Sequence, residues 1–278
     1  AVQPPPPGAV RIFAGGDSRD DSAHVLPWAI GEAHARGAEA FLFLGDMELT
    51  PQLDGSFARE IAALDPIPLY PVLGNHEIRQ FGFLAIGQAG AERSFAARFL
   101  GTPRTPVRSA LPGRVVYSVS LPGGVHFVAL DNVSQSGFGA EQLAWLAADL
   151  DAATADHEVR HVVVGMHKPL AHNGVTQHCM EADGPQAVAD SDAALDLFAR
   201  HHVALILASH VHQFTRFTQA GIPTYVTGGL GAPLTASGPD HAFHHVLQLD
   251  VTDAGIHVEV LRYAGPPVMA TRDGDDGD

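Results

Sequence analysis

Short runs of apolar residues recur along this chain of 278 residues, and each run ends in a cluster of polar or charged residues. Continuous apolar runs of this length are typical of β-strands that are covered on both faces, because no polar face is left for solvent. The pattern therefore predicts a set of buried strands, each followed by a polar loop. The stretches with this pattern are residues 9–19, 38–49, 66–77, 160–170 and 202–212.

Helical periodicity fills most of the intervals between these strands. In one interval, for example, Leu143, Leu146 and Leu150 fall on the same helical face. Strands that alternate with helices in this way favour an α/β sheet. The stretches that predict helices are residues 22–37, 56–64, 139–153 and 190–202.

Two further regions predict antiparallel pairing. Residues 114–132 contain two alternating strands joined around Pro-Gly-Gly, which indicates a hairpin, and residues 221–263 predict three more strands separated by turns. The sheet system is therefore expected to be mixed, parallel in the first part and antiparallel in the last. Because the sequence shows no internal repeat and no linker, we expect a single domain over residues 9–264, between a flexible proline-rich lead-in (1–8) and an acidic tail (265–278).

Composition narrows the functions that such a fold can serve. The formal net charge is −15 with histidine neutral, which disfavours nucleic acid backbones and anionic membranes as main partners. Cys179 is the single cysteine, so the sequence offers neither an intrachain disulfide nor a multi-cysteine zinc site. No apolar run reaches the ~20 residues of a membrane span. The start at Ala1, followed by a proline run, suggests a processed terminus, and we expect export to the periplasm or the extracellular space.

Residue types that bind metals follow the predicted strands at the points where the strands end. In open α/β sheets the carboxyl ends of the strands form the ligand-binding edge, so these side chains are expected to converge. Carboxylate oxygens and neutral imidazoles suit Zn, Mn, Fe or Co, and a shared carboxylate can hold two such ions about 3.5–4 Å apart for displacement at phosphorus. The residues at these strand ends are Asp17, Asp46, Asn75, His76, His167, His210 and His212.

The motifs around these residues resemble those of the calcineurin-like metallophosphoesterases. They are Gly-Asp at 16–17 and 45–46, Gly-Asn-His-Glu at 74–77, His167 before Lys-Pro, and His-Val-His at 210–212. The segments VHFVALDN, EQLAWLAADL and YVTGGLGAP are similar to segments of the purple-acid-phosphatase-like branch. The resemblance covers nearly the whole chain and implies an α/β (α+β) fold, a four-layer αββα sandwich of two mixed β-sheets flanked by helices.

The resemblance also implies a dinuclear centre that hydrolyses phosphate esters. A hydroxide bound to two divalent or trivalent ions (Fe, Mn or Zn) would attack phosphorus in line, with a small phosphorylated molecule, most directly a phosphomonoester, as substrate. Asp46 would bridge the ions, and His76 would act on the leaving oxygen without binding metal. The other ligands would be Asp17 and His212 for one ion, and Asn75, His167 and His210 for the other.

The first motif of this chain departs from the family pattern. The family usually places a histidine ligand two residues after the first aspartate, whereas this chain has Arg19, which stays protonated and cannot bind a cation. The purple acid phosphatases instead supply a tyrosine three residues after the bridging aspartate, where this chain has Leu49. Three alternatives follow for the ion of Asp17 and His212: Glu48 supplies an oxygen, water completes the site, or the chain holds one metal only.

Two roles are open for Arg19. Its guanidinium can bind a substrate phosphate in bidentate fashion, or it can form a salt bridge with a loop acid such as Asp20 or Asp21.

Three functions are open for the chain as a whole. It can be a phosphomonoesterase, a phosphodiesterase for nucleotides or lipid head groups, or a catalytically degenerate module that binds phosphate on the same fold. The survival of six ligand-type residues together with His76 favours an active hydrolase.

Overall fold

The strands of the protein form two β-sheets in the computed structural model, which describes residues 5–19, 21, 24–47, 61–78, 87–102, 105–171, 178–235, 237–266 and 268. The first sheet contains β1 (Val10–Gly15), β2 (Ala40–Phe43), β3 (Leu69–Pro71), β11 (His245–Thr252) and β12 (Gly255–Arg262). The second contains β4 (Ser109–Ala110), β5 (Tyr117–Leu121), β6 (Val125–Ala129), β7 (His161–Gly165), β8 (Leu205–Ala208), β9 (Phe214–Gln219) and β10 (Ile222–Thr227).

Both sheets are mixed, as the sequence predicts. The five-stranded sheet has the order β12-β11-β1-β2-β3, with β1, β2 and β3 parallel and β11 antiparallel to both of its neighbours. The seven-stranded sheet has the order β4-β5-β6-β7-β8-β10-β9, in which β6, β7, β8 and β10 are parallel. The predicted hairpin is β5–β6. One expectation is confirmed only in part: β10 pairs antiparallel with β9, as expected for the last strands, but parallel with β8, because the chain first forms β9 at the sheet edge and then returns between the two.

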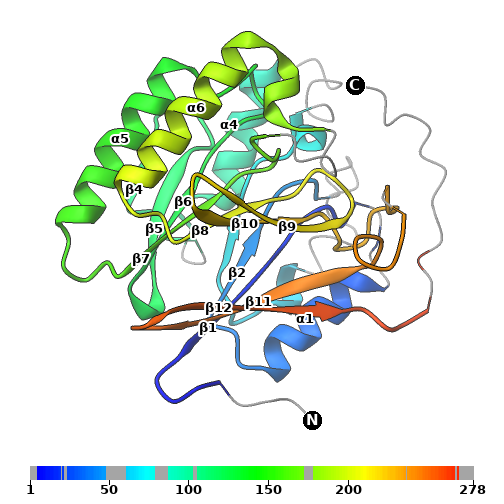
Figure 1. Ribbon diagram of the computed structural model, residues 1–278. Helices are drawn as coiled ribbons and strands as arrows, with labels where there is room; N and C mark the ends of the chain where they lie inside the picture. The colour runs from blue at the N-terminus through cyan, green and yellow to red at the C-terminus, as the bar shows by residue number, and fades with distance from the viewer. Residues whose placement is uncertain are drawn as a thin grey trace.

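Buried apolar side chains form three layers of core, which separate four layers of secondary structure (Figure 1). One core layer joins Ile30 of α1 (Val25–Ala35) and Phe95 of α4 (Gly87–Phe99) to the five-stranded sheet. The second lies between the sheets, and the third joins Leu146 of α5 (Gly139–Ala155) and Phe198 of α6 (Pro185–Arg200) to the seven-stranded sheet. The arrangement is the expected αββα sandwich. The described residues also include the short 3-10 turns η1 (Pro122–Gly124) and η2 (Met180–Asp183).

The polar strand ends of both sheets meet at one edge of the sandwich. Backbone hydrogen bonds link the segments that follow the strands: Asp17 N–H donates to Gly45 O at 3.0 Å, and Gly16 N–H donates to Thr227 O at 3.1 Å. The same kind of link joins Met166 N–H, just after β7, to Leu207 O of β8 at 3.0 Å. These contacts hold the loops after β1, β2, β7, β8 and β10 against each other, so their side chains converge.

Two expectations concern helices. The helix predicted over 56–64 falls within the described residues only from residue 61 onward, where a helical turn is present. In the part of the chain that the structure describes, no helix is both long and apolar enough to cross a membrane.

Candidate metal centre

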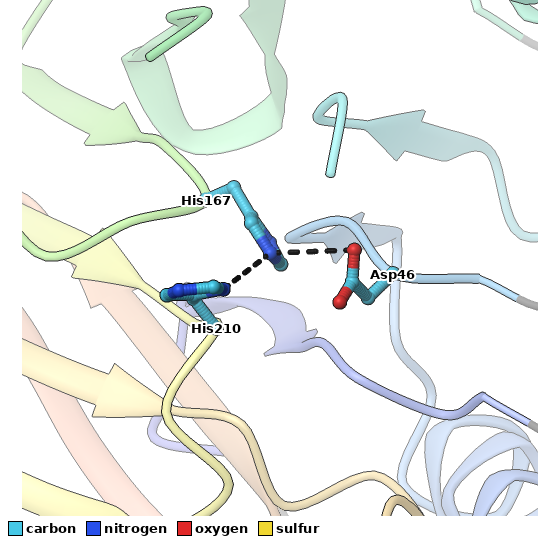
Figure 2. A group of neighbouring side chains, drawn as sticks. All are labelled: Asp46, His167 and His210. Carbon is cyan, nitrogen blue, oxygen red and sulfur yellow. Dashed lines mark hydrogen bonds and ion pairs between the residues drawn. The ribbon is translucent and has the colours of Figure 1, made fainter. Parts of the chain in front are cut away.

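Two groups of metal-ligand residue types share one carboxylate at this edge. Asp46, His167 and His210 form one group, and Asp17, Asp46 and His212 form the other; within each group the candidate ligand atoms lie within 4.8 Å of one another. Figure 2 shows the first group, in which the imidazoles of His167 and His210 and the Asp46 carboxylate point toward a common centre. The sequence predicted these five residues, and the fold brings all of them together.

His167 lies at the centre of the first group. Its Nε2 is 3.3 Å from Asp46 Oδ1, 2.9 Å from Asn75 Oδ1 and 3.2 Å from His210 Nδ1. Its Nδ1 lies 2.8 Å from Leu44 O, a carbonyl that can only accept, so Nδ1 carries the proton. In the neutral ring the lone pair of Nε2 therefore faces Asp46 and Asn75, which is the orientation that a metal ligand needs.

His212 is oriented in the same way in the second group. Its Nδ1 donates to Pro233 O at 2.8 Å, and its Nε2 lies 3.4 Å from Asp17 Oδ1. The other carboxylate oxygen of Asp17 accepts hydrogen bonds from Ser209 Oγ and, at 2.9 Å, from the backbone N–H of His210. Asp17 Oδ1 is buried and has no hydrogen-bond partner within the described part of the chain. An anionic oxygen left in this state fits a cation, so the residues present suit a bound metal.

The pKa shifts of these groups share one electrostatic origin. Burial alone would raise the pKa of Asp46, but the nearby His167 lowers it well below its usual range. Burial alone would lower the pKa of His167, but Asp46 and Asp17 raise it to about 9. Burial and the charge of His167 together lower the pKa of His210 to about 3. The buried carboxylates thus favour positive charge in this space, and a bound metal ion would supply that charge while the imidazoles stay neutral.

The backbone around the site adopts an uncommon conformation. Asp17, Asp46 and His210 have φ angles of 60°, 55° and 67°, in the left-handed region that non-glycine residues seldom occupy. Such conformations cluster at functional sites and persist only where the surrounding structure enforces them. At Gly74, an added Cβ would overlap the backbone nitrogen and the carboxylate of Asp46. The loop before Asn75 can therefore approach Asp46 only because residue 74 has no side chain.

Arg19 and His76 lie beside the shared carboxylate and contact each other. Arg19 Nη1 is 2.5 Å from His76 Nε2 and 3.7 Å from Asp46 Oδ2. The backbone N–H of His76 donates to Asp46 Oδ1 at 3.0 Å. Asp21, one of the acids considered as a partner for Arg19, instead accepts the backbone N–H groups of His24 and Val25 at the start of α1, at 3.1 and 2.5 Å. Glu48, Leu49 and Asp20 lie outside the described residues, so the prediction for Glu48 stays untested.

Glu77 supports the site in a way that the sequence did not reveal. Its Oε2 accepts the backbone N–H groups of Asp46 and Gly74, at 3.0 and 2.6 Å, and its side chain is fully buried. Burial and the nearby Asp46 carboxylate raise the pKa of Glu77 to about 8. Its position in Gly-Asn-His-Glu was the available signal, but the pattern alone does not distinguish a support from a ligand.

Asn132 is a second support that the sequence did not assign. Its Oδ1 accepts the backbone N–H of Lys168 at 3.1 Å, and its Nδ2 donates to Lys168 O at 2.7 Å. This reciprocal pair fixes the peptide that directly follows His167. The position of Asn132 just beyond the end of β6 gave the same signal as the ligand residues, a polar side chain at a strand end.

Three solved structures resemble this fold at low sequence identity. A purple acid phosphatase isolated from yellow lupin (Lupinus luteus) seeds has a TM-score of 0.68 and 16% identity; the match covers 96% of this chain and 54% of that one, so the chain spans about half the length of the lupin enzyme. A dimetal phosphatase from Danio rerio has a TM-score of 0.57 and 15% identity, over 92% of this chain and 99% of that one. The anchor protein of the inner membrane complex of Plasmodium has a TM-score of 0.57 and 13% identity, over 97% and 99%.

At these identities the likeness establishes the fold alone, and the family follows from the sequence. The pattern of the calcineurin-like phosphoesterases matches residues 15–214, a range that starts two residues before Asp17 and ends two residues after His212. It therefore includes both candidate ligand groups. The chain belongs to the calcineurin-like phosphoesterase family.

Proposed function

We propose that the chain is a metal-dependent phosphoesterase that hydrolyses small phosphate esters, phosphomonoesters in the first place, at a dinuclear centre. The observation that carries the proposal is that Asp46 belongs to both groups of closely spaced metal-ligand atoms. A carboxylate with two oxygens can serve two cations, one on each side. Two bound cations would supply Lewis-acid activation at phosphorus and a nucleophile at neutral pH.

The residues of each group have the chemistry that this centre needs. Asp17, Asp46 and His212 would hold one ion, and Asp46, Asn75, His167 and His210 the other. Asn75 is included because its Oδ1 lies 2.9 Å from His167 Nε2. Oxygen and imidazole donors without thiolate suit Fe, Mn or Zn. Asp17 Oδ1 supports this assignment, because it is buried, accepts no hydrogen bond within the described residues and has His212 Nε2 3.4 Å away, whereas an ionised oxygen in the protein interior needs a compensating positive charge.

His76 and Arg19 would act on the substrate rather than on metal. Their side chains are 18% and 14% exposed, so they border both the buried carboxylate and solvent. The Arg19 guanidinium can donate two parallel hydrogen bonds to a phosphate and orient the phosphoryl group. His76 Nε2 would then face the leaving oxygen and stabilise the charge that develops there.

A second candidate is a phosphate-binding module without turnover. Two observations favour it: a permanent cation, Arg19, stands 3.7 Å from the shared carboxylate, and one structure of the same fold is described as an anchor. A phosphodiesterase is the alternative within the enzyme class, and the same ligand set would serve it.

Elemental analysis of the purified full chain, combined with hydrolysis of an aryl phosphate, separates these functions. Two metal ions per chain, and activity that is lost on chelation and restored by Mn²⁺, Zn²⁺ or iron, are expected. The variant His76→Ala should keep both metals and lose about 10²-fold or more in kcat, the usual contribution of a positioned acid or base.

The exposed His157, whose side chain is 91% accessible, provides the matched control, since His157→Ala should change neither quantity. A bis-aryl phosphate assayed in parallel tests the diesterase alternative. Metal binding without hydrolysis of either substrate, with any of these metals, would favour the binding module.

A further inference from the structure

The two carboxylate oxygens of Asp46 face different cationic groups. Oδ1 lies 3.3 Å from His167 Nε2, on the side of the first group (Figure 2). Oδ2 lies 3.7 Å from Arg19 Nη1 and 3.8 Å from His76 Nε2. The imidazoles can give up a proton to a metal ion, whereas the guanidinium keeps its charge at every accessible pH. One side of Asp46 is thus permanently faced by a positive charge.

The backbone holds Arg19 in this position. Its φ angle is 47°, its N–H donates to Asp46 O at 3.2 Å, and it forms a parallel bridge with Met47. Two residues earlier, Asp17 is held in turn by Gly45 O and by hydrogen bonds from Ser209 and His210. Because its main chain is fixed to the residue that carries the shared carboxylate, Arg19 can turn its side chain but cannot move away from Asp46.

The two ligand groups also differ in what else they offer a metal ion. Asp46, His167 and His210 are joined by Asn75, whose Oδ1 lies beside His167 Nε2. No fourth histidine, cysteine or acidic side chain joins Asp17, Asp46 and His212 within the described residues. Asp17 adds negative charge that would attract a cation to this second group, whereas the guanidinium of Arg19, 3.7 Å from the shared Asp46 carboxylate, adds positive charge with the opposite effect.

We propose that Arg19 is a built-in counter-cation that makes the two metal positions unequal, so that Asp17, Asp46 and His212 bind their ion more weakly and exchange it faster. The inference rests on the proposed dinuclear centre. If Asp46 Oδ1 serves the ion beside His167, Oδ2 is left for the ion of Asp17 and His212. That ion would have to displace or tolerate the guanidinium, which lies 3.7 Å from Oδ2, and the repulsion between like charges is large in a buried site. The occupancy of the weaker position would then follow the free metal concentration.

Calorimetric titration of the metal-free full chain with Mn²⁺ tests the inference through affinities alone. The natural chain is expected to show two classes of site whose Kd values differ by about tenfold or more. Two neighbouring cations repel each other in any dinuclear centre, so variants at position 19 must reveal the cause. Arg19→Gln should tighten the weaker Kd by about tenfold, since the charge is gone, while Arg19→Lys should leave it within about threefold.

The matched control is Arg108→Gln, which removes an arginine whose partners are Ser120 and Asp156 rather than a candidate ligand. It should change neither Kd. Equal affinities in the natural chain, an unchanged weaker Kd in Arg19→Gln, or tightening in Arg19→Lys as large as in Arg19→Gln would each overturn the inference. Should a variant fail to fold, equal affinities in the natural chain would still overturn the inference.

Failure of this inference is distinguishable from failure of the proposed function. Two equal sites in a chain that hydrolyses aryl phosphate would remove only the role of Arg19. A chain that binds no Mn²⁺, and no other divalent transition metal, would remove the dinuclear centre as well.

Discussion

At the scale of the residue, the site depends on backbone conformations that few side chains adopt. Asp17, Asp46 and His210 are all left-handed, and each directly precedes or follows a residue that binds a neighbouring loop. A left-handed residue turns the chain sharply, which places its side chain in the space beyond the strand rather than along the sheet face. The surrounding hydrogen bonds must therefore supply the energy that these conformations cost, about 1 kcal/mol or more at each position.

Glu77 is the residue on which this arrangement most directly depends. We expect Glu77→Ala to lower the free energy of unfolding by about 2–5 kcal/mol, because two buried backbone N–H groups, of Asp46 and Gly74, lose their acceptor. Glu77→Gln should lower it less than Glu77→Ala does, since the amide oxygen still accepts both backbone N–H groups, while the amide nitrogen takes the place of Oε1, which has no hydrogen-bond partner within the described residues. Chemical denaturation at pH 7 measures both.

The same pair of variants separates positioning from stability. Glu77→Ala should also weaken Mn²⁺ binding, because Asp46 loses a backbone hydrogen bond, whereas Glu77→Gln should bind Mn²⁺ as the natural chain does. A Glu77→Gln variant as unstable as Glu77→Ala would contradict the prediction that the two accepted hydrogen bonds carry the stabilisation.

At the scale of the element, hydrophobic patterning predicted most of the segments that form helices and strands, because such a pattern depends on neighbouring residues alone. The helices predicted over 139–153 and 190–202 correspond to α5 and α6, and the apolar runs correspond to the parallel strands that carry the site. The pairing of β10 with β8 was not predictable, because a strand pattern specifies its faces but not its neighbour. The helix α4 was also missed, since its apolar stripe is weak and its burial comes from Phe95 and Phe99 against distant strands.

A buried polar cluster fastens α5 to the seven-stranded sheet. Asp149 accepts hydrogen bonds from Ser118 of β5 and His126 of β6, both at 2.7 Å, and all three side chains are buried. We expect Asp149→Ala to lower the free energy of unfolding by about 3 kcal/mol, because it leaves two buried polar partners without an acceptor.

Two further substitutions show whether this loss comes from the cluster. Asp149→Asn keeps an acceptor and should cost about 1 kcal/mol. Asp151→Ala removes an aspartate from the same helix whose side chain is 76% exposed, and should change stability by less than about 0.5 kcal/mol. Urea denaturation of the three variants measures these differences, and equal losses at positions 149 and 151 would refute the role of the cluster.

At the scale of the whole molecule, the sequence predicted which residues converge but not how they are held. Strand ends and residue types were enough to bring together Asp17, Asp46, His167, His210 and His212, because the edge of a parallel sheet is a property of the fold class. The contact of Arg19 with His76 was not predicted. It depends on the left-handed turn at Arg19 and on a loop from another strand, and neither is encoded in a local pattern.

Stability should fall as the pH is lowered toward 5, and one buried histidine makes a measurable part of that fall. Burial lowers the pKa of His245 to about 4, where the fully buried ring contacts Thr227 Oγ1 and Phe243 O at 3.0 Å each. Its pKa in the unfolded chain is 6.5, the ordinary value. Between these two values the unfolded chain binds a proton that the folded chain does not, so the free energy of unfolding decreases as the pH falls through this window.

The contribution of His245 is expected to be about 2 kcal/mol between pH 7 and pH 5, from the two pKa values. His245→Gln should therefore lose about that much less stability than the natural chain over the same range, although its stability at pH 7 is lower. The exposed His157 supplies the control, and His157→Gln should follow the natural chain. Parallel pH dependences of the natural chain and His245→Gln would contradict the assignment.

Metal binding should stabilise the whole fold, because the ligands of the proposed centre come from loops after strands of both sheets. An ion that binds the folded state alone raises the free energy of unfolding by about 2.7 kcal/mol per site at a concentration 100 times its Kd. We expect Mn²⁺ to raise the Tm by several degrees and a chelator to reverse the rise.

The 17 histidines of the chain also bind metal when the chain is unfolded, which reduces the shift in Tm and makes a matched variant necessary. Asp46→Asn weakens the residue that both ligand groups share, so its Tm should respond to Mn²⁺ much less than that of the natural chain. A shift of the same size in both proteins would place the stabilising ion elsewhere on the molecule.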